Sequence, residues 1–268
     1  MKYFSNILYI NQKIMRTEGI KAALIVDYQK AFATKKVKEL YVNGWEILAP
    51  IINEVVRDVK SKWWIILSSR DIHRSWNISF AQNFKWKVPI TESIRNWLQP
   101  WPQNFITLTE IKNWTEQNNW LEDTAWFTVY ELKAYLSTLE NQTMALWPVH
   151  CVANTSWAEY QEWLDTSQID IELIKWYNNA EHPYSAFPWI EIWTTRDMLE
   201  VLKEKKVKKI KLTWLAADWC VLKSAIDIVW IWWIIVEFIK KATKAVSPEN
   251  EIEYLGKMRE AWVIIIEG

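Results

Sequence analysis

Three side chains that could together perform nucleophilic catalysis each follow a short apolar run. Asp27 follows the run at 22–26, Lys175 follows the run at 169–174, and Cys220 opens a helical segment shortly after the run at 210–215. Cysteine hydrolysis needs a thiol nucleophile, a base that takes its proton and a positive charge that stabilises the thiolate. The N-terminus of a helix adds to that stabilisation. Taken singly, the carboxylate and the lysine also fit ordinary loop positions, so their joint occurrence is the informative feature.

A second group of side chains could bind a metal ion. Asp71 and His73 follow the run at 63–67, separated from it by Ser-Ser-Arg, and His150 precedes Cys151. Imidazole nitrogen and carboxylate oxygen are common ligands of divalent metals, and three protein ligands leave coordination positions open. We interpret Cys151 as a small buried apolar residue.

The runs that precede these residues have the composition of buried strands. Six β-branched apolar runs are found, at 22–26, 63–67, 169–174, 210–215, 234–239 and 263–266. Helical patterns alternate with them, at 45–59, 197–205, 219–229 and 250–260. This alternation predicts a three-layer α/β/α fold with a six-stranded, mainly parallel sheet. The carboxyl ends of parallel strands lie at one edge, where ligands bind, so the polar residues are expected to converge there.

Composition limits the partners and the surroundings of the chain. Lysine plus arginine equals aspartate plus glutamate at 32 each, which argues against binding to nucleic acid. The longest apolar run, at 228–236, is far shorter than the roughly 18 residues of a membrane span, so no membrane association is expected. Only two cysteines are present, which favours a reducing, cytoplasmic location. No signal peptide is recognisable.

The domain organisation is expected to be simple. Residues 1–20 form an extension whose natural start could be Met1 or Met15, and 21–268 form a single domain. Between the second and third strands, 84–144 is polar and loop-like with one clear helix at 128–139, which indicates a long insertion. The insertion could serve as a lid, as an oligomer contact or as a cover for an exposed sheet edge.

The motifs around these residues resemble those of nicotinamidases, within the isochorismatase-like cysteine hydrolase superfamily. The resemblance runs from about residue 22 to the C-terminus and excludes the insertion. Its motifs occur in the family's order, as DYQKAF at 27–32, RDIH at 70–73, WPVHCV at 147–152, Lys175, YSAF at 184–187 and WLAADWCV at 214–221. The metal motif favours the nicotinamidase branch over relatives that lack it.

The resemblance implies a role for each position. Asp27, Lys175 and Cys220 correspond to the catalytic triad, and the backbone N–H groups of Ala216 and Cys220 to the oxyanion hole, next to a cis peptide at 215–216. The ring-binding positions and metal ligands match Phe32, Trp147, Asp71, His73 and His150. The metal is expected to be zinc, with iron or manganese as alternatives, and the substrate to be nicotinamide. A homo-oligomer is also possible.

Two departures from the family pattern leave other functions open. Trp76 and Asn77 replace the usual Asn-His, and Ala217 replaces the usual threonine of the nucleophile motif. The alternatives are an amidohydrolase of the same family that acts on another small amide, or a non-catalytic Trp-rich binding protein. The complete set of Asp27, Lys175 and Cys220 argues against the binding protein, which has no need of these residues.

The chain has 22 tryptophans and four glycines. Average usage would give roughly 19 glycines in a chain of this length. In the resemblance, Trp157, Trp176, Trp214, Trp232 and Trp262 stand where the family has glycine, whereas Trp147 stands where it has tryptophan. We therefore expect UGA codons, read as glycine in the source, at most of the tryptophan positions.

Overall fold

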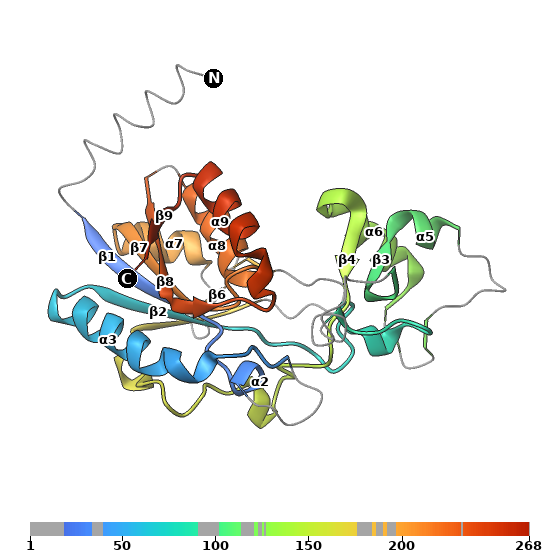
Figure 1. Ribbon diagram of the computed structural model, residues 1–268, viewed down its shortest axis with the longest axis horizontal. Coiled ribbons are helices and arrows are strands. Elements are labelled where there is room, and N and C mark those ends of the chain that lie inside the picture. Colours follow the sequence, from blue (N-terminus) through green and yellow to red (C-terminus); the bar gives the residue numbers. More distant parts are fainter. Residues whose placement is uncertain are drawn as a thin grey trace, which may run out of the picture.

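Seven strands form the main sheet of the computed structural model, in the order β6-β5-β2-β1-β7-β8-β9 (Figure 1). The structure describes residues 19–33, 40–90, 102–113, 121–122, 125, 127–175, 184–185, 190–191, 197–231 and 233–267. The parallel strands are β1 (Ile20–Val26), β2 (Ile65–Arg70), β5 (Ile171–Ile174), β7 (Val207–Leu215), β8 (Ile235–Lys244) and β9 (Ile264–Ile266). The six predicted strands are confirmed. A seventh, β6 (Ile190–Glu191), pairs antiparallel with β5 and was not predicted.

Helices cover both faces of the sheet, which confirms the three-layer α/β/α architecture. Successive residues of β1 alternate between two apolar clusters: Leu24 packs with one and Ile25 with the other. The cluster around Leu24 includes residues of α7 (Met198–Glu204), α8 (Cys220–Val229) and α9 (Glu251–Glu260). The cluster around Ile25 includes α3 (Leu48–Ser61) and the short α2 (Lys30–Ala33). In Figure 1, α3 lies on the opposite side of the sheet from α8 and α9.

The described residues of the predicted insertion form a small structured unit of their own. Strands β3 (Phe105–Thr107) and β4 (Thr143–Ala145) pair antiparallel, and α5 (Leu108–Lys112) packs near α6 (Val129–Thr138). A separate apolar cluster, including Ile106 and Leu132, forms the core of this unit. Figure 1 shows it set apart from the main sheet. The helix predicted at 128–139 is confirmed and begins with a capping box between Thr128 and Glu131; α5, β3 and β4 were not predicted.

Short 3-10 helices complete the described elements: η1 (Trp45–Ile47), η2 (Ala81–Asn83), η3 (Pro102–Asn104), η4 (Glu140–Gln142), η5 (Ser156–Ala158), η6 (Thr166–Gln168) and η7 (Pro248–Asn250). Residues 1–18, which include Met1 and Met15, lie outside the described part of the chain. Among the helices that are described, none is long and apolar enough to cross a membrane.

Candidate active site

The three side chains predicted to act together meet at the carboxyl ends of β5, β1 and β7, on one edge of the sheet. Lys175, which follows β5, lies at their centre and is 1% exposed. Its Nζ is 3.1 Å from Oδ2 of Asp27, 3.4 Å from Oδ1 of Asp71 and 3.3 Å from Sγ of Cys220. One buried ammonium group therefore links the nucleophile, the candidate base and a candidate metal ligand.

Asp27 is held in place by the neighbouring strand β2. Its backbone N–H donates to the carbonyl and to Oγ of Ser69, both at 3.1 Å, and the Ser69 hydroxyl is 3.0 Å from Oδ1 of Asp27. Burial raises the pKa of Asp27 to about 6, although the Lys175 ammonium opposes this rise. A carboxylate with this pKa is ionised at neutral pH and is near the pH at which a general base works best.

Opposing effects act on the other two groups of this trio. Burial alone would lower the pKa of Lys175, but the Asp27 and Asp71 carboxylates outweigh it and hold the pKa well above the ordinary value. For Cys220, burial raises the pKa of the thiol, and the predicted lowering by Lys175 is present but smaller. The resting site therefore combines a protonated lysine, a protonated thiol and an ionised Asp27.

The sharp turn before α8 presents the thiol to the site. Cys220 is the first residue of α8, where backbone N–H groups lack partners within the helix. A cis peptide bond joins Leu215 to Ala216, as the resemblance implied. The turn is closed by two hydrogen bonds to the carbonyl of Ala216, from the N–H groups of Trp219 and Val221, each at 3.1 Å.

Asp71, His73 and His150 bring three ligand atoms within 4.8 Å of one another, and all three residues are buried. Nε2 of His73 is 2.9 Å from Oδ2 of Asp71, and Nε2 of His150 is 3.5 Å from the same atom. Two imidazole nitrogens and one carboxylate are a donor set suited to zinc or another divalent metal.

The protonation and orientation of these ligands also fit a metal. Burial lowers the pKa of His73, which favours the neutral ring that a metal requires. Burial opposes ionisation of Asp71, but His73 and Lys175 outweigh it and hold its pKa well below the usual carboxyl value. Nδ1 of His150 is 2.8 Å from the carbonyl of Pro148, so that nitrogen carries the proton and Nε2 is left for coordination.

Gln29 fixes the spacing between the two carboxylates. It is fully buried, and its side-chain amide donates to the carbonyls of Asp71 at 2.7 Å and Ala158 at 2.9 Å. Its side-chain oxygen accepts the N–H of Asp71 at 2.7 Å. The backbone of the metal ligand is thereby clamped to the loop that also carries Asp27.

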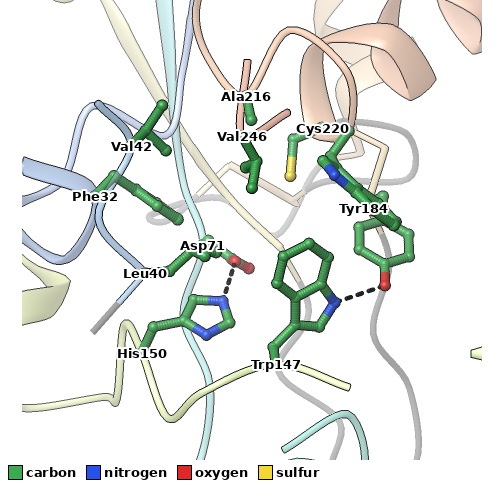
Figure 2. A pocket seen from close by; sticks show the side chains of 11 residues that line it. Phe32, Leu40, Val42, Asp71, Trp147, His150, Tyr184, Ala216, Cys220 and Val246 are labelled. Atoms are coloured by element: carbon green, nitrogen blue, oxygen red, sulfur yellow. Dashed lines mark hydrogen bonds and ion pairs between the residues drawn. The ribbon is translucent and has the colours of Figure 1, made fainter. Parts of the chain in front are cut away.

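A largely apolar pocket lies against the thiol (Figure 2). Figure 2 shows the sulfur of Cys220 facing the space between Val246 and Trp147. The indole N–H of Trp147 donates to the hydroxyl of Tyr184 at 2.8 Å. The pocket is lined by Phe32, Leu40, Val42, Asp71, Trp147, His150, Tyr184, Ala216, Trp219, Cys220 and Val246.

Every residue predicted for the site therefore lies in this region. Phe32 and Trp147 line the pocket, and Ala216 lies in its wall beside Cys220. Cys151 is fully buried in the apolar cluster of the α3 side, as expected for a structural cysteine. Sequence reasoning missed the contributions of Leu40, Val42 and Val246. Val246 comes just after the carboxyl end of β8, a position that the strand-end argument could have selected.

Comparisons with known proteins find nicotinamidases among the chains of similar sequence. The chain is 26% identical over 213 residues to a curated nicotinamidase of Saccharomyces cerevisiae, covering 78% of this chain and 81% of the relative. It is 23% identical over 248 residues to a nicotinamidase of Schizosaccharomyces pombe, covering 91% and 92%. No protein-family model matches the chain.

Solved structures share the fold. The nicotinamidase/pyrazinamidase of Acinetobacter baumanii matches with a TM-score of 0.66 at 22% identity, covering 94% of this chain and 98% of its own. A pyrazinamidase of Pyrococcus horikoshii, in complex with zinc, matches with 0.60 at 22%, covering 92% and 99%. Yeast nicotinamidase bound to the inhibitor nicotinaldehyde matches with 0.66 at 20%, covering 93% and 100%.

Proposed function

We propose that this chain, a homologue of the nicotinamidases with the isochorismatase-like hydrolase fold, hydrolyses nicotinamide to nicotinate and ammonia. The observation that carries the proposal is the position of Lys175, which contacts the Cys220 thiol, the Asp27 carboxylate and the metal-ligand candidate Asp71 at the same time. A binding protein would have no use for such a buried, polar and costly arrangement.

In the first half of the reaction, the thiol becomes bonded to the substrate. Ionised Asp27 accepts the proton of Cys220, and the sulfur attacks the carboxamide carbon. The carbonyl oxygen becomes negative, and the backbone N–H groups of Ala216 and Cys220 are proposed to stabilise it. The C–N bond then breaks, Asp27 returns its proton to the departing nitrogen, and ammonia and a thioester are formed.

The second half regenerates the enzyme. Asp27, again ionised, takes a proton from water, whose oxygen attacks the thioester carbon. The C–S bond breaks and Asp27 returns its proton to the sulfur. The acid is released and loses its carboxyl proton to water or ammonia, which gives nicotinate. The Lys175 ammonium stays 3.3 Å from the sulfur and stabilises its anionic form in both halves.

The metal and the apolar walls are proposed to select the substrate. Asp71, His73 and His150 would hold zinc, with iron or manganese as alternatives. When bound, the metal supplies a Lewis-acid centre that accepts the lone pair of a pyridine nitrogen. Phe32 and Trp147 line the pocket in which the flat ring would lie. We place the reaction in the salvage of pyridine nucleotides in the cytoplasm, a reducing compartment in which buried thiols such as Cys151 and Cys220 are common.

Ammonia release from nicotinamide tests the proposal. We expect steady turnover by the unaltered chain and only background release by Cys220→Ala. The matched control is Cys151→Ala, which removes a buried thiol from outside the pocket and should retain turnover if folded. Equal rates from the unaltered chain and Cys220→Ala would end the proposal.

A substrate panel separates nicotinamide from other small amides. Benzamide has the same ring size and carboxamide but no ring nitrogen, and pyrazinamide has a second one. Faster turnover of nicotinamide than of benzamide, with the difference abolished by a chelator, supports recognition of the ring nitrogen. Preference for an aliphatic amide would assign the chain to another branch of the family.

A further inference from the structure

The turn that carries the nucleophile is bonded to the loop after β8, which forms one wall of the pocket. Asp218, between the cis peptide and Cys220, accepts the N–H of Val246 with Oδ1 and the N–H of Ser247 with Oδ2, both at 2.9 Å. The N–H of Ala217 also donates to the carbonyl of Lys244 at 2.8 Å. Consecutive N–H groups on one partly buried carboxylate form a rigid link, because both oxygens are engaged and charged acceptors make strong hydrogen bonds.

This link determines where the pocket wall stands relative to the thiol. Val246 lines the pocket beside Ala216 and Cys220, and Figure 2 shows its side chain next to both. We propose that Asp218 is a positioning residue that fixes Val246 against the Cys220 thiol and thereby shapes the binding space for a flat substrate. The inference rests on the proposed function for its substrate, but the position of the wall can be tested without turnover.

The test is a double-mutant cycle on Asp218 and Val246. Asp218→Asn keeps the shape but turns one acceptor into a donor that faces a backbone N–H, and Val246→Ala removes the wall side chain alone. The first readout is alkylation of Cys220 by iodoacetamide, followed on the Cys220 peptide by mass spectrometry. Asp218→Asn should alkylate about ten-fold faster, the effect of losing one charge-assisted hydrogen bond. Val246→Ala should alkylate at least as fast, because the wall side chain itself is gone. The double variant should be no faster than the single ones.

The second readout is turnover of nicotinamide, where KM should rise by about the same factor while kcat changes less. If the unaltered chain does not turn over nicotinamide, the proposed function fails and the alkylation cycle still decides the inference. The positioning role of Asp218 would be overturned if the two effects on the alkylation rate multiply in the double variant. It would also be overturned if Asp218→Asn lowers the unfolding temperature but leaves the alkylation rate unchanged.

A different observation carries a second inference, about the tryptophans. Among the described residues, four tryptophans have positive φ: Trp63 at 59°, Trp86 at 66°, Trp214 at 89° and Trp262 at 69°. This region is unfavourable for bulky L-residues and is used mainly by glycine. Trp63 and Trp86 are 92% and 82% exposed, so little packing offsets the unfavourable backbone there.

The end of α3 shows why the backbone favours glycine at 63. The N–H of Trp63 donates to the carbonyl of Lys60 at 3.0 Å, and the N–H of Trp64 donates to that of Val59 at 3.2 Å. This pair of hydrogen bonds defines a Schellman motif, whose left-handed residue is usually glycine. Trp63 occupies that position.

The end of α9 has the same pattern. The N–H of Trp262 donates to the carbonyl of Arg259 and the N–H of Val263 to that of Met258, both at 2.9 Å. Trp262 is the left-handed residue of this motif. Trp214, in contrast, lies at a register shift of β7, and its ring centroid is only 3.9 Å from that of Tyr28. Its indole N–H does donate to the carbonyl of Asp27 at 2.9 Å, so 63 and 262 are the cleaner test positions.

We infer that the natural polypeptide has glycine at 63, 86, 214 and 262, encoded by UGA. The gene should show UGA at these positions and UGG at 147, where the tryptophan is buried and hydrogen-bonded. In the recombinant chain, Trp63→Gly should raise the midpoint of thermal unfolding by about 2–4 °C. The matched control is the adjacent Trp64→Gly, at ordinary φ under the Lys21 ammonium, which should lower it. UGG codons at the four positions, or a lowered midpoint for Trp63→Gly, would overturn the inference.

Discussion

Replacing Lys175 by methionine should disable the site and destabilise the fold at the same time. The substitution keeps most of the length of the unbranched side chain and removes its charge. It leaves the carboxylates of Asp27 and Asp71, both essentially inaccessible to solvent, without the ammonium that lies 3.1 Å and 3.4 Å from them. Removing one partner of a buried ion pair costs about 3–5 kcal/mol of the free energy of unfolding.

The loss of stability should depend on pH, with a sign that follows from Asp27. Its pKa in the folded chain is already raised to about 6 by burial, and without Lys175 it must rise further. A carboxyl group whose folded pKa exceeds the unfolded value stabilises the fold below the unfolded pKa, and this contribution is lost as pH rises through the folded pKa. The variant should therefore be closest to the unaltered chain near pH 5 and most destabilised near pH 8.

Activity should fall for a related reason. With its pKa raised further, Asp27 is protonated at neutral pH and cannot accept the thiol proton, and the thiolate loses its nearest cation. We expect kcat/KM for nicotinamide to fall by at least about 10²–10⁴-fold, the usual contribution of a positioned acid–base group.

The assay combines urea unfolding at pH 5 and pH 8 with a separate measurement of ammonia release. The unfolding measurement contains a chelator, so that a metal at Asp71 does not replace the missing charge. Lys257→Met is the matched control, because that lysine pairs with Glu253 at 2.6 Å on the surface. It should change the free energy of unfolding by about 0.5 kcal/mol or less. Wild-type activity in Lys175→Met, or a destabilisation equal at both pH values, would refute the reasoning.

Three further outcomes are expected. The value of kcat/KM should decline as pH falls through about 6, where Asp27 becomes protonated, and a constant value from pH 8 to pH 5 would contradict its role as base. His73→Ala should lose bound metal, measured by elemental analysis, and should no longer favour nicotinamide over benzamide; retained metal would remove His73 from the ligand set. Trp147→Phe, which loses the N–H that donates to Tyr184, should raise KM roughly 2–10-fold, and Tyr184→Phe should raise it by the same factor. The double variant should have the KM of the single variants, and additive effects would mean that the hydrogen bond is not the cause.

Local sequence patterns predicted the elements that hold the site because those elements are regular. The β-branched run at 22–26 and the helical pattern at 219–229 lie within β1 and α8 or at their ends, and the positions of Asp27 and Cys220 followed from them. The strand β6 was missed because a strand of two residues is too short to show an alternating pattern. Its pairing with β5 is set by contacts between residues far apart in the sequence. In the small unit around Ile106 and Leu132 the helix at 128–139 was predicted, but the strands β3 and β4 were missed because they are short and pair across a long stretch of polar sequence.

The pocket shows a different limit. The strand-end argument could have selected Val246, but Leu40 is an ordinary apolar residue, and only the folded chain shows that it lines the same pocket as Cys220.

The protonation state of Cys220 also could not be predicted from the neighbouring sequence, because it depends on burial in the folded chain. The start of α8 and the nearby lysine both favour a thiolate, yet burial raises the pKa of Cys220 above its usual value. Burial acts on Asp27 in the same direction but brings its pKa only to about 6, so the carboxylate stays ionised at neutral pH while the thiol stays protonated. In the proposed mechanism, the proton is therefore on sulfur before substrate binds and moves to Asp27 as the C–S bond forms. A resting protonated thiol resists oxidation and unwanted alkylation, and Lys175, 3.3 Å from the sulfur, stabilises the anion only when that transfer occurs.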